Sequence, residues 1–136
     1  MSEVVIGLDY GRKRIGVAGC WASLVEPLEI IENTGTPTDP LVLQKIIALC
    51  RREQATRLII GISEDDMAAE TCIFAEALVQ QLLPQVLPLE YFDETLSSQD
   101  ADRRLRESGA PLKKRRARTD HYAAATMLEE WVEAQE

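Results

Sequence analysis

Three acidic residues end or begin apolar segments of this chain, in positions that suit metal ligands. Asp9 closes the apolar run that starts at Val4, Glu94 follows the run around Phe92, and Asp120 opens the apolar segment near the carboxyl terminus. Carboxylate oxygens are the preferred ligands of Mg²⁺ and Mn²⁺. Two such ions about 3.5–4 Å apart can activate water and stabilise a leaving oxygen. If the fold brings these acids together, they predict metal-dependent phosphoryl chemistry.

Each acid also has an ordinary structural explanation. Asp9 could cap a turn, Glu94 could be a surface acid, and Asp120 could be the N-cap of a helix. The metal-site hypothesis therefore depends on the three residues acting together and on the elements that position them.

Basic residues are concentrated near the candidate acids. The chain carries −8 overall, yet residues 103–118 hold eight basic residues and one acid, a local charge of +7 that leaves −15 on the other 120 residues. A phosphate substrate responds to such a local field. We predict nucleic-acid contacts at Arg12, Lys13, Arg14, Lys113, Lys114, Arg115, Arg116 and Arg118. The alternative is a solvated, arginine-rich helix end and turn.

Length and composition favour one globular domain, residues 1–136. Apolar residues make up 46% and charged residues 28% of the chain, which is typical of a globular protein rather than a disordered one. No apolar run approaches the roughly 20 residues that span a bilayer, and no signal peptide is visible. We expect a cytoplasmic protein without membrane contact. The three cysteines form neither a disulfide framework nor a zinc pattern.

Apolar periodicity and turn residues predict a mixed sheet with helices on its faces. Short links favour antiparallel pairing of the first three strands, and later helical crossovers add parallel strands beside the first. The expected strand order is 3-2-1-4-5, with strand one central. We expect strands at 3–9, 14–21, 28–31, 57–62 and 86–92, helices at 40–50, 63–83 and 98–105, a basic, exposed and mobile loop at 110–118, and a last helix that starts at Asp120.

This arrangement would bring the acids to one edge of the sheet. Asp9 ends the central strand and Glu94 ends a parallel strand, so both should project from the edge where α/β sheets form clefts. Asp120 reaches that edge if the last helix packs across it.

The motifs resemble those of the YqgF family of pre-16S rRNA nucleases, which are Holliday-junction-resolvase-like proteins of the RNase H-like fold. The resemblance covers essentially the whole chain. It rests on Gly7-Leu8-Asp9-Tyr10-Gly11 with Arg14-Ile15-Gly16-Val17-Ala18, on Asp93-Glu94-Thr95-Leu96-Ser97-Ser98, and on Asp120 before Ala123-Ala124-Ala125. It implies that Asp9, Glu94 and Asp120 are catalytic, metal-binding acids, and that the protein processes the 5′ end of 16S rRNA in the cytoplasm.

Two segments depart from the family pattern. Thr95 stands where the family often has arginine, so a phosphate contact is missing there. The segment from Gly61 to Ala68 lacks the proline and second glycine that the family often carries after the fourth strand. It offers Glu64 as a rival or additional metal ligand, with stabilisation of a helix N-terminus as the alternative role.

The leading hypothesis is a metal-dependent endonuclease that acts on precursor rRNA. The first alternative is a resolvase of branched DNA that uses the same acids. The second is a non-catalytic nucleic-acid-binding module for ribosome assembly. Substrate identity, oligomeric state and the number of metal ions are not determined by these patterns.

Overall fold

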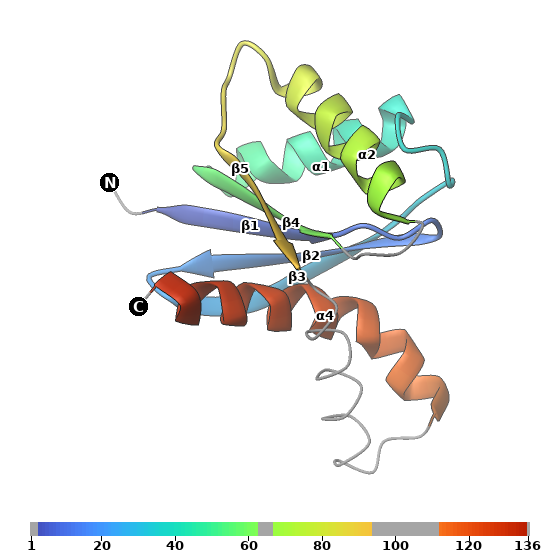
Figure 1. Cartoon of the computed structure of the whole chain (residues 1–136), viewed down its shortest axis with the longest axis vertical. Coiled ribbons are helices and arrows are strands. Elements are labelled where there is room, and N and C mark those ends of the chain that lie inside the picture. The colour runs from blue at the N-terminus through green and yellow to red at the C-terminus, as the bar shows by residue number, and fades with distance from the viewer. Residues whose placement is uncertain (1–2, 63–66, 94–111, 136) are drawn as a thin grey trace.

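A five-stranded mixed sheet lies between two layers of helices (Figure 1). Helices α1 and α2 cover one face and α4 covers the other. The computed structural model describes residues 3–62, 67–93 and 112–135, with side chains in α4 described from Ala123 onward. The elements are β1 (Val4–Asp9), β2 (Arg14–Trp21), β3 (Leu24–Glu32), α1 (Pro40–Arg52), β4 (Arg57–Ile62), α2 (Met67–Leu82), β5 (Leu89–Asp93) and α4 (Leu112–Gln135).

The central position of β1 is confirmed by the strand order β3-β2-β1-β4-β5. β1 pairs with β2 in antiparallel fashion and with β4 in parallel fashion, and β5 is parallel to β4. The first strand is short and apolar because helices cover both of its faces, which removes the need for a polar side. The strands β1, β4 and β5 consequently end at the same edge of the sheet.

Alternating residues of β1 contribute to two separate cores. Ile6 and Leu8 are fully buried against α1 and α2, whereas Val5 packs in the core under α4. Gly7 also faces α4, since a Cβ built there would lie 2.6 Å from Cγ of Leu128. The same alternation puts Asp9 on the face covered by α4.

The edge strand β3 begins earlier than expected. The prediction that Pro27 would open this strand at Leu28 is wrong, because β3 starts at Leu24 and contains Pro27. Proline is tolerated there because the outer side of an edge strand needs no hydrogen-bond partner. The pairing with β2 shifts register between Val17 and Ala18, opposite this proline. The fifth strand begins later than predicted, at Leu89 rather than at residue 86.

Helix α1 follows its predicted start. The Asp39 carboxylate accepts a hydrogen bond from the Leu41 amide at 3.0 Å, and Pro40 occupies the first turn. In α2, Phe74 and Leu78 are buried as expected, but Ile73 is 48% exposed and does not belong to the apolar stripe. Thr71 and Ala75 take its place against the core, because they lie on the same side of the helix as Leu78 and Phe74.

Helix α4 begins eight residues before the expected position. The segment predicted as a loop at 110–118 is helical from Leu112 onward. The run Lys-Lys-Arg-Arg-Ala-Arg after Leu112 contains good helix formers and no glycine or proline, and this outweighs the mutual repulsion of its charges. Asp120 is therefore inside the helix, which excludes the N-cap explanation for it. The predicted inner face of this helix is confirmed, since Ala124, Met127, Leu128 and Trp131 are buried.

Candidate active site

Asp9 lies at the sheet edge where the parallel strands end. It is the last residue of β1, and its neighbour Leu8 is in register with Ile60 of β4. Ile62 of β4 is in register with Asp93, the last residue of β5. Asp9 is partly exposed and has further interactions within the protein. The geometry gives it a carboxylate on the face of the sheet that α4 covers.

Helix α4 crosses this face antiparallel to β1. Trp131, near its carboxyl end, lies beside Glu90 at the start of β5, and Leu128 lies against Gly7. One helical turn back, about 6 Å along the axis, is Ala124, which is fully buried. Two residues of β1 advance by about 6.6 Å, so position 124 lies alongside the end of β1. Asp120 is one turn further in the same direction.

A carboxylate on α2 fixes the turn that follows Asp9. The Glu70 carboxylate accepts a hydrogen bond from the Tyr10 hydroxyl at 3.1 Å and from Nε of Arg12 at 2.9 Å. The Tyr10 ring packs on Phe74 with centroids 4.7 Å apart. Burial raises the pKa of Tyr10, and the Arg12 hydrogen bond lowers the pKa of Glu70. The first turn of α2 is thereby tied to the β1–β2 turn.

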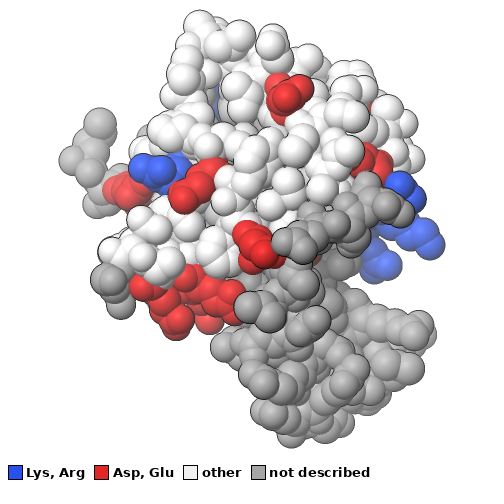
Figure 2. All heavy atoms as spheres, viewed as in Figure 1, with Lys and Arg blue, Asp and Glu red and all other residues white. Residues whose placement is uncertain are grey.

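Backbone contacts hold the same turn from the other side. Asn33 donates from Nδ2 to the Gly11 carbonyl at 2.7 Å, and its amide donates to the Lys13 carbonyl at 2.8 Å. A Cβ at Gly11 would lie 2.6 Å from the Arg14 carbonyl oxygen, so this close approach requires glycine. The turn thus presents Arg12, Lys13 and Arg14 as exposed cations. Figure 2 shows basic side chains gathered on the side of the molecule where this turn lies in Figure 1.

The other predicted site residues have different outcomes. Glu94 and Glu64 lie outside the described residues, although Glu94 comes two positions after Phe92, which packs under α4. Asp120 and the predicted cations Lys113, Lys114, Arg115, Arg116 and Arg118 are placed by backbone only, within α4. Among the side chains that the structure describes, no group of three His, Cys, Asp or Glu residues could hold a metal ion. Convergence of the three acids therefore stays a prediction.

The contacts of Glu70 and Asn33 were not anticipated. Glu70 lies 60 residues from Tyr10 and Asn33 lies 22 residues from Gly11. Neither residue belongs to a motif, and only knowledge of the packing brings them to the turn after Asp9.

Comparison with known proteins gives the family. The family model RuvX, described as "Holliday junction resolvase", matches residues 3–134. The chain belongs to this family. It is therefore a nuclease-class hydrolase, as the motifs predicted.

Curated relatives agree over nearly their whole length. A protein named "Putative pre-16S rRNA nuclease" from Anaeromyxobacter sp. (strain Fw109-5) is 32% identical over 133 residues, which covers 94% of this chain and 95% of the relative. A protein of the same name from Crocosphaera subtropica is 33% identical over 136 residues, with 94% and 91% covered.

A solved structure supports the fold. The chain is similar to T. thermophilus RuvC, solved in complex with a Holliday junction substrate, with a TM-score of 0.54 and 16% identity over 98% of this chain and 95% of that one. The predicted RNase H-like fold is confirmed. Within the described part of the chain, no helix has the length and apolar character needed to cross a membrane.

Proposed function

We propose that this protein is a cytoplasmic, divalent-metal-dependent endonuclease that cleaves precursor 16S rRNA near its 5′ end. The observation that carries this proposal is the position of Asp9, at the shared end of the parallel strands and on the face crossed by α4. Asp120 lies on the helix that reaches this edge. Family membership and the names of the relatives supply the reaction class and the substrate.

We assign Asp9, Glu94 and Asp120 as the acids that hold Mg²⁺ or Mn²⁺, with Glu64 as an additional ligand. The donor set fits these ions, because carboxylates are hard oxygen donors and no histidine or cysteine is among them. The ions, when bound, supply a nucleophilic hydroxide and neutralise charge at the cleaved phosphate. The protein's own part is to hold the carboxylates at a fixed spacing, and the packing of Leu128 on Gly7 sets the distance between α4 and β1.

The cations near this edge are assigned to the phosphate backbone. Arg12 is 63% exposed while Glu70 holds its Nε, so the guanidinium is oriented before any substrate arrives. The first turns of α4 carry Lys113, Lys114, Arg115 and Arg116. Cations at a helix N-terminus oppose the helix dipole, so helix stability does not explain them. Contact with the phosphate backbone of a nucleic acid explains their presence there.

Branched DNA is the second candidate substrate, favoured by the family's description as a Holliday junction resolvase. The same acids would serve either reaction, and the difference lies in the surface that positions the nucleic acid. A four-way junction has two equivalent strands to cut. A resolvase therefore needs two active sites that act on one substrate.

The decisive experiment compares cleavage of precursor 16S rRNA and of a four-way DNA junction, each with Mg²⁺, with Mn²⁺ and with chelator. Asp9→Asn keeps the side-chain shape and removes one charge. We expect this variant to lose cleavage by a factor of at least about 10² and to retain nucleic-acid binding. Arg52→Gln, on the far end of α1, is a control that should cleave at the wild-type rate.

The outcomes separate the hypotheses. Cleavage of the junction but not of the precursor RNA would identify a resolvase. Wild-type cleavage by Asp9→Asn would overturn the assigned site. Binding of precursor RNA without cleavage under all metal conditions would favour the non-catalytic assembly module.

A further inference from the structure

A cavity of about 530 Å³ lies at the end of the sheet opposite Asp9. It is bounded by the starts of β1 and β4, the β2–β3 turn at Ala22 and Ser23, and the last turns of α4 at Val132 and Gln135. Its volume is within the range of small-ligand pockets. Val5 lines it and lies four residues before Asp9, about 13 Å along the strand. The cavity is therefore separate from the candidate active site.

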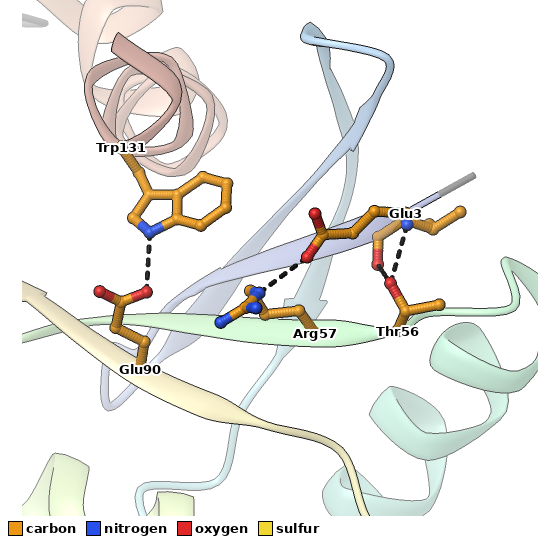
Figure 3. A network of polar contacts seen from close by, with 6 residues as sticks. Glu3, Thr56, Arg57, Glu90 and Trp131 are labelled. Atoms are coloured by element: carbon orange, nitrogen blue, oxygen red, sulfur yellow. Dashed lines mark hydrogen bonds and ion pairs between the residues drawn. The ribbon is translucent and has the colours of Figure 1, made fainter. Parts of the chain in front are cut away.

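Polar contacts connect the residues that form the walls of the cavity (Figure 3). Trp131 is 7% exposed and donates its indole N–H to Glu90 at 2.8 Å. The Arg57 guanidinium lies 6.0 Å from the Trp131 ring centroid and donates from Nε to Glu3 at 2.8 Å. Thr56 joins the two strand starts, because its hydroxyl donates to the Val4 carbonyl and accepts from the Val4 amide. The pocket is thus formed without a ligand.

The charge around the cavity is negative. Arg57 is the one cation among the described residues that line it, and Glu3 already pairs with it. Glu90 lies behind Trp131, and the last two turns of α4 carry Glu129, Glu130 and Glu133, with no basic residue in the last turn. Figure 2 shows acidic side chains gathered where α4 ends. A phosphate would be repelled here, whereas a cation would be attracted.

We propose that this cavity and the acidic end of α4 form a docking site for a basic segment of a partner protein, with a lysine or arginine side chain in the cavity. The aliphatic part of that side chain would pack on Val5, Val132 and the edge of Trp131. Its charged head would lie near the half-exposed carboxylate of Glu3. A single exposed ion pair contributes little, so the negative charge near the end of α4 favours an occupant with several cations. A basic peptide meets this requirement and a small amine does not.

This proposal is independent of the cleavage reaction, because the docking site and Asp9 lie at opposite ends of β1. The test uses the full chain and a fluorescent octapeptide of alternating lysine and alanine, with a glutamate–alanine peptide of the same length as the probe control. Binding is followed by fluorescence anisotropy, and amide shifts by NMR locate it.

We expect the lysine peptide to shift the amides of Val5, Ser23 and Val132. Glu133→Lys should weaken binding about fivefold or more. Glu76→Lys, an exposed position on α2, makes the same change in net charge on the other face and should have no such effect. Both substitutions are on exposed helix positions and should leave the fold intact, which the NMR spectra will show directly.

Three results would overturn the proposal. The first is equal weakening by Glu133→Lys and Glu76→Lys, which would indicate attraction to net charge alone. The second is peptide-induced shifts confined to residues outside the cavity, or no binding. The third is a single-stranded RNA that shifts the cavity amides while the lysine peptide does not.

Discussion

At the end of the sheet where β1 finishes, exposed cations lie on a short turn and Glu70 orients one of them. At the opposite end, Arg57 is the one described cation that lines the cavity, and it lies between Glu3 and the Trp131 ring. Helix α4 connects the two ends, with basic residues in its first turns and acidic residues near its last. Cations at the amino-terminal end of a helix and carboxylates at its carboxyl-terminal end both interact unfavourably with the helix dipole. Helix stability therefore does not account for the charge distribution of α4, and this agrees with the two binding roles proposed above.

Among variants that leave the proposed metal ligands intact, the largest effect should come from the contact that joins α4 to β1. Gly7→Ala brings a Cβ to 2.6 Å from Cγ of Leu128, so the Leu128 side chain or the helix that carries it must shift relative to the strand that carries Asp9. We expect a loss of about 1–3 kcal/mol in the free energy of unfolding and a decrease in cleavage of at least about tenfold. Chemical denaturation and cleavage rates measure the two effects.

A second glycine provides the control. A Cβ at Gly19 would lie 2.4 Å from the Trp21 ring and 3.0 Å from Leu28, and Leu28 packs with the core under α1 and α2. Gly19→Ala should cost similar stability but leave cleavage near the wild-type rate. If the two variants lose cleavage equally, the effect is general destabilisation, and the spacing of α4 from β1 is not what the site depends on.

An intermediate effect is expected from the basic end of α4. Replacement of Lys114 and Arg115 by alanine should weaken nucleic-acid binding and reduce the slope of log K against log salt concentration by up to about 1.8. Replacement of Arg51 and Arg52 at the end of α1 makes the same change in charge. That control should leave the slope unchanged. A slope that is the same in all three proteins would show that this segment does not contact the phosphate backbone.

The smallest effect concerns Glu70 and is expected to depend on pH. The Arg12 hydrogen bond lowers the pKa of Glu70 in the folded protein. The carboxylate therefore stabilises the fold above the ordinary carboxyl pKa, and this contribution disappears as pH falls through the lowered value. Glu70→Gln should unfold more easily than wild type near neutral pH, and the difference should vanish in acid.

Urea unfolding of wild type and Glu70→Gln from about pH 7 to about pH 2 measures this difference. Tyr10→Phe is the matched control, since it removes the other hydrogen bond to Glu70 and leaves the Arg12 pair in place. A difference between Glu70→Gln and wild type that persists unchanged in acid would mean that packing, rather than the charge of Glu70, is responsible.

Local patterns were sufficient to predict much of this fold. β1 and β4 are short apolar runs with clear boundaries, and their pairing follows from link lengths and crossover rules. The errors have physical causes. Pro27 was predicted to begin a strand, but an edge strand can contain proline in its interior. The run of charged residues after Leu112 was predicted to be a loop, but lysine, arginine and alanine have high helix propensity.

The site was predictable only in part. Asp9 could be located because it ends a central strand, a position that sequence pattern determines. The hydrogen bond of Arg12 to Glu70 and the contacts of Arg57 with Glu3 and Trp131 join residues 54 to 74 positions apart in the chain. Such contacts arise from the packing of helices on the sheet, and no spacing rule in the sequence reveals them.

The irregular edge strand β3 also affects how copies of this protein behave toward one another. Strand β3 carries Pro27, a register shift opposite it, and exposed glutamates at 26, 29 and 32. An unprotected sheet edge can add strands from neighbouring molecules and lead to aggregation. Here the missing amide hydrogen, the distorted pairing and the repelling charges all act against that addition. These features of β3 disfavour the addition of a strand from a second copy at this edge of the sheet.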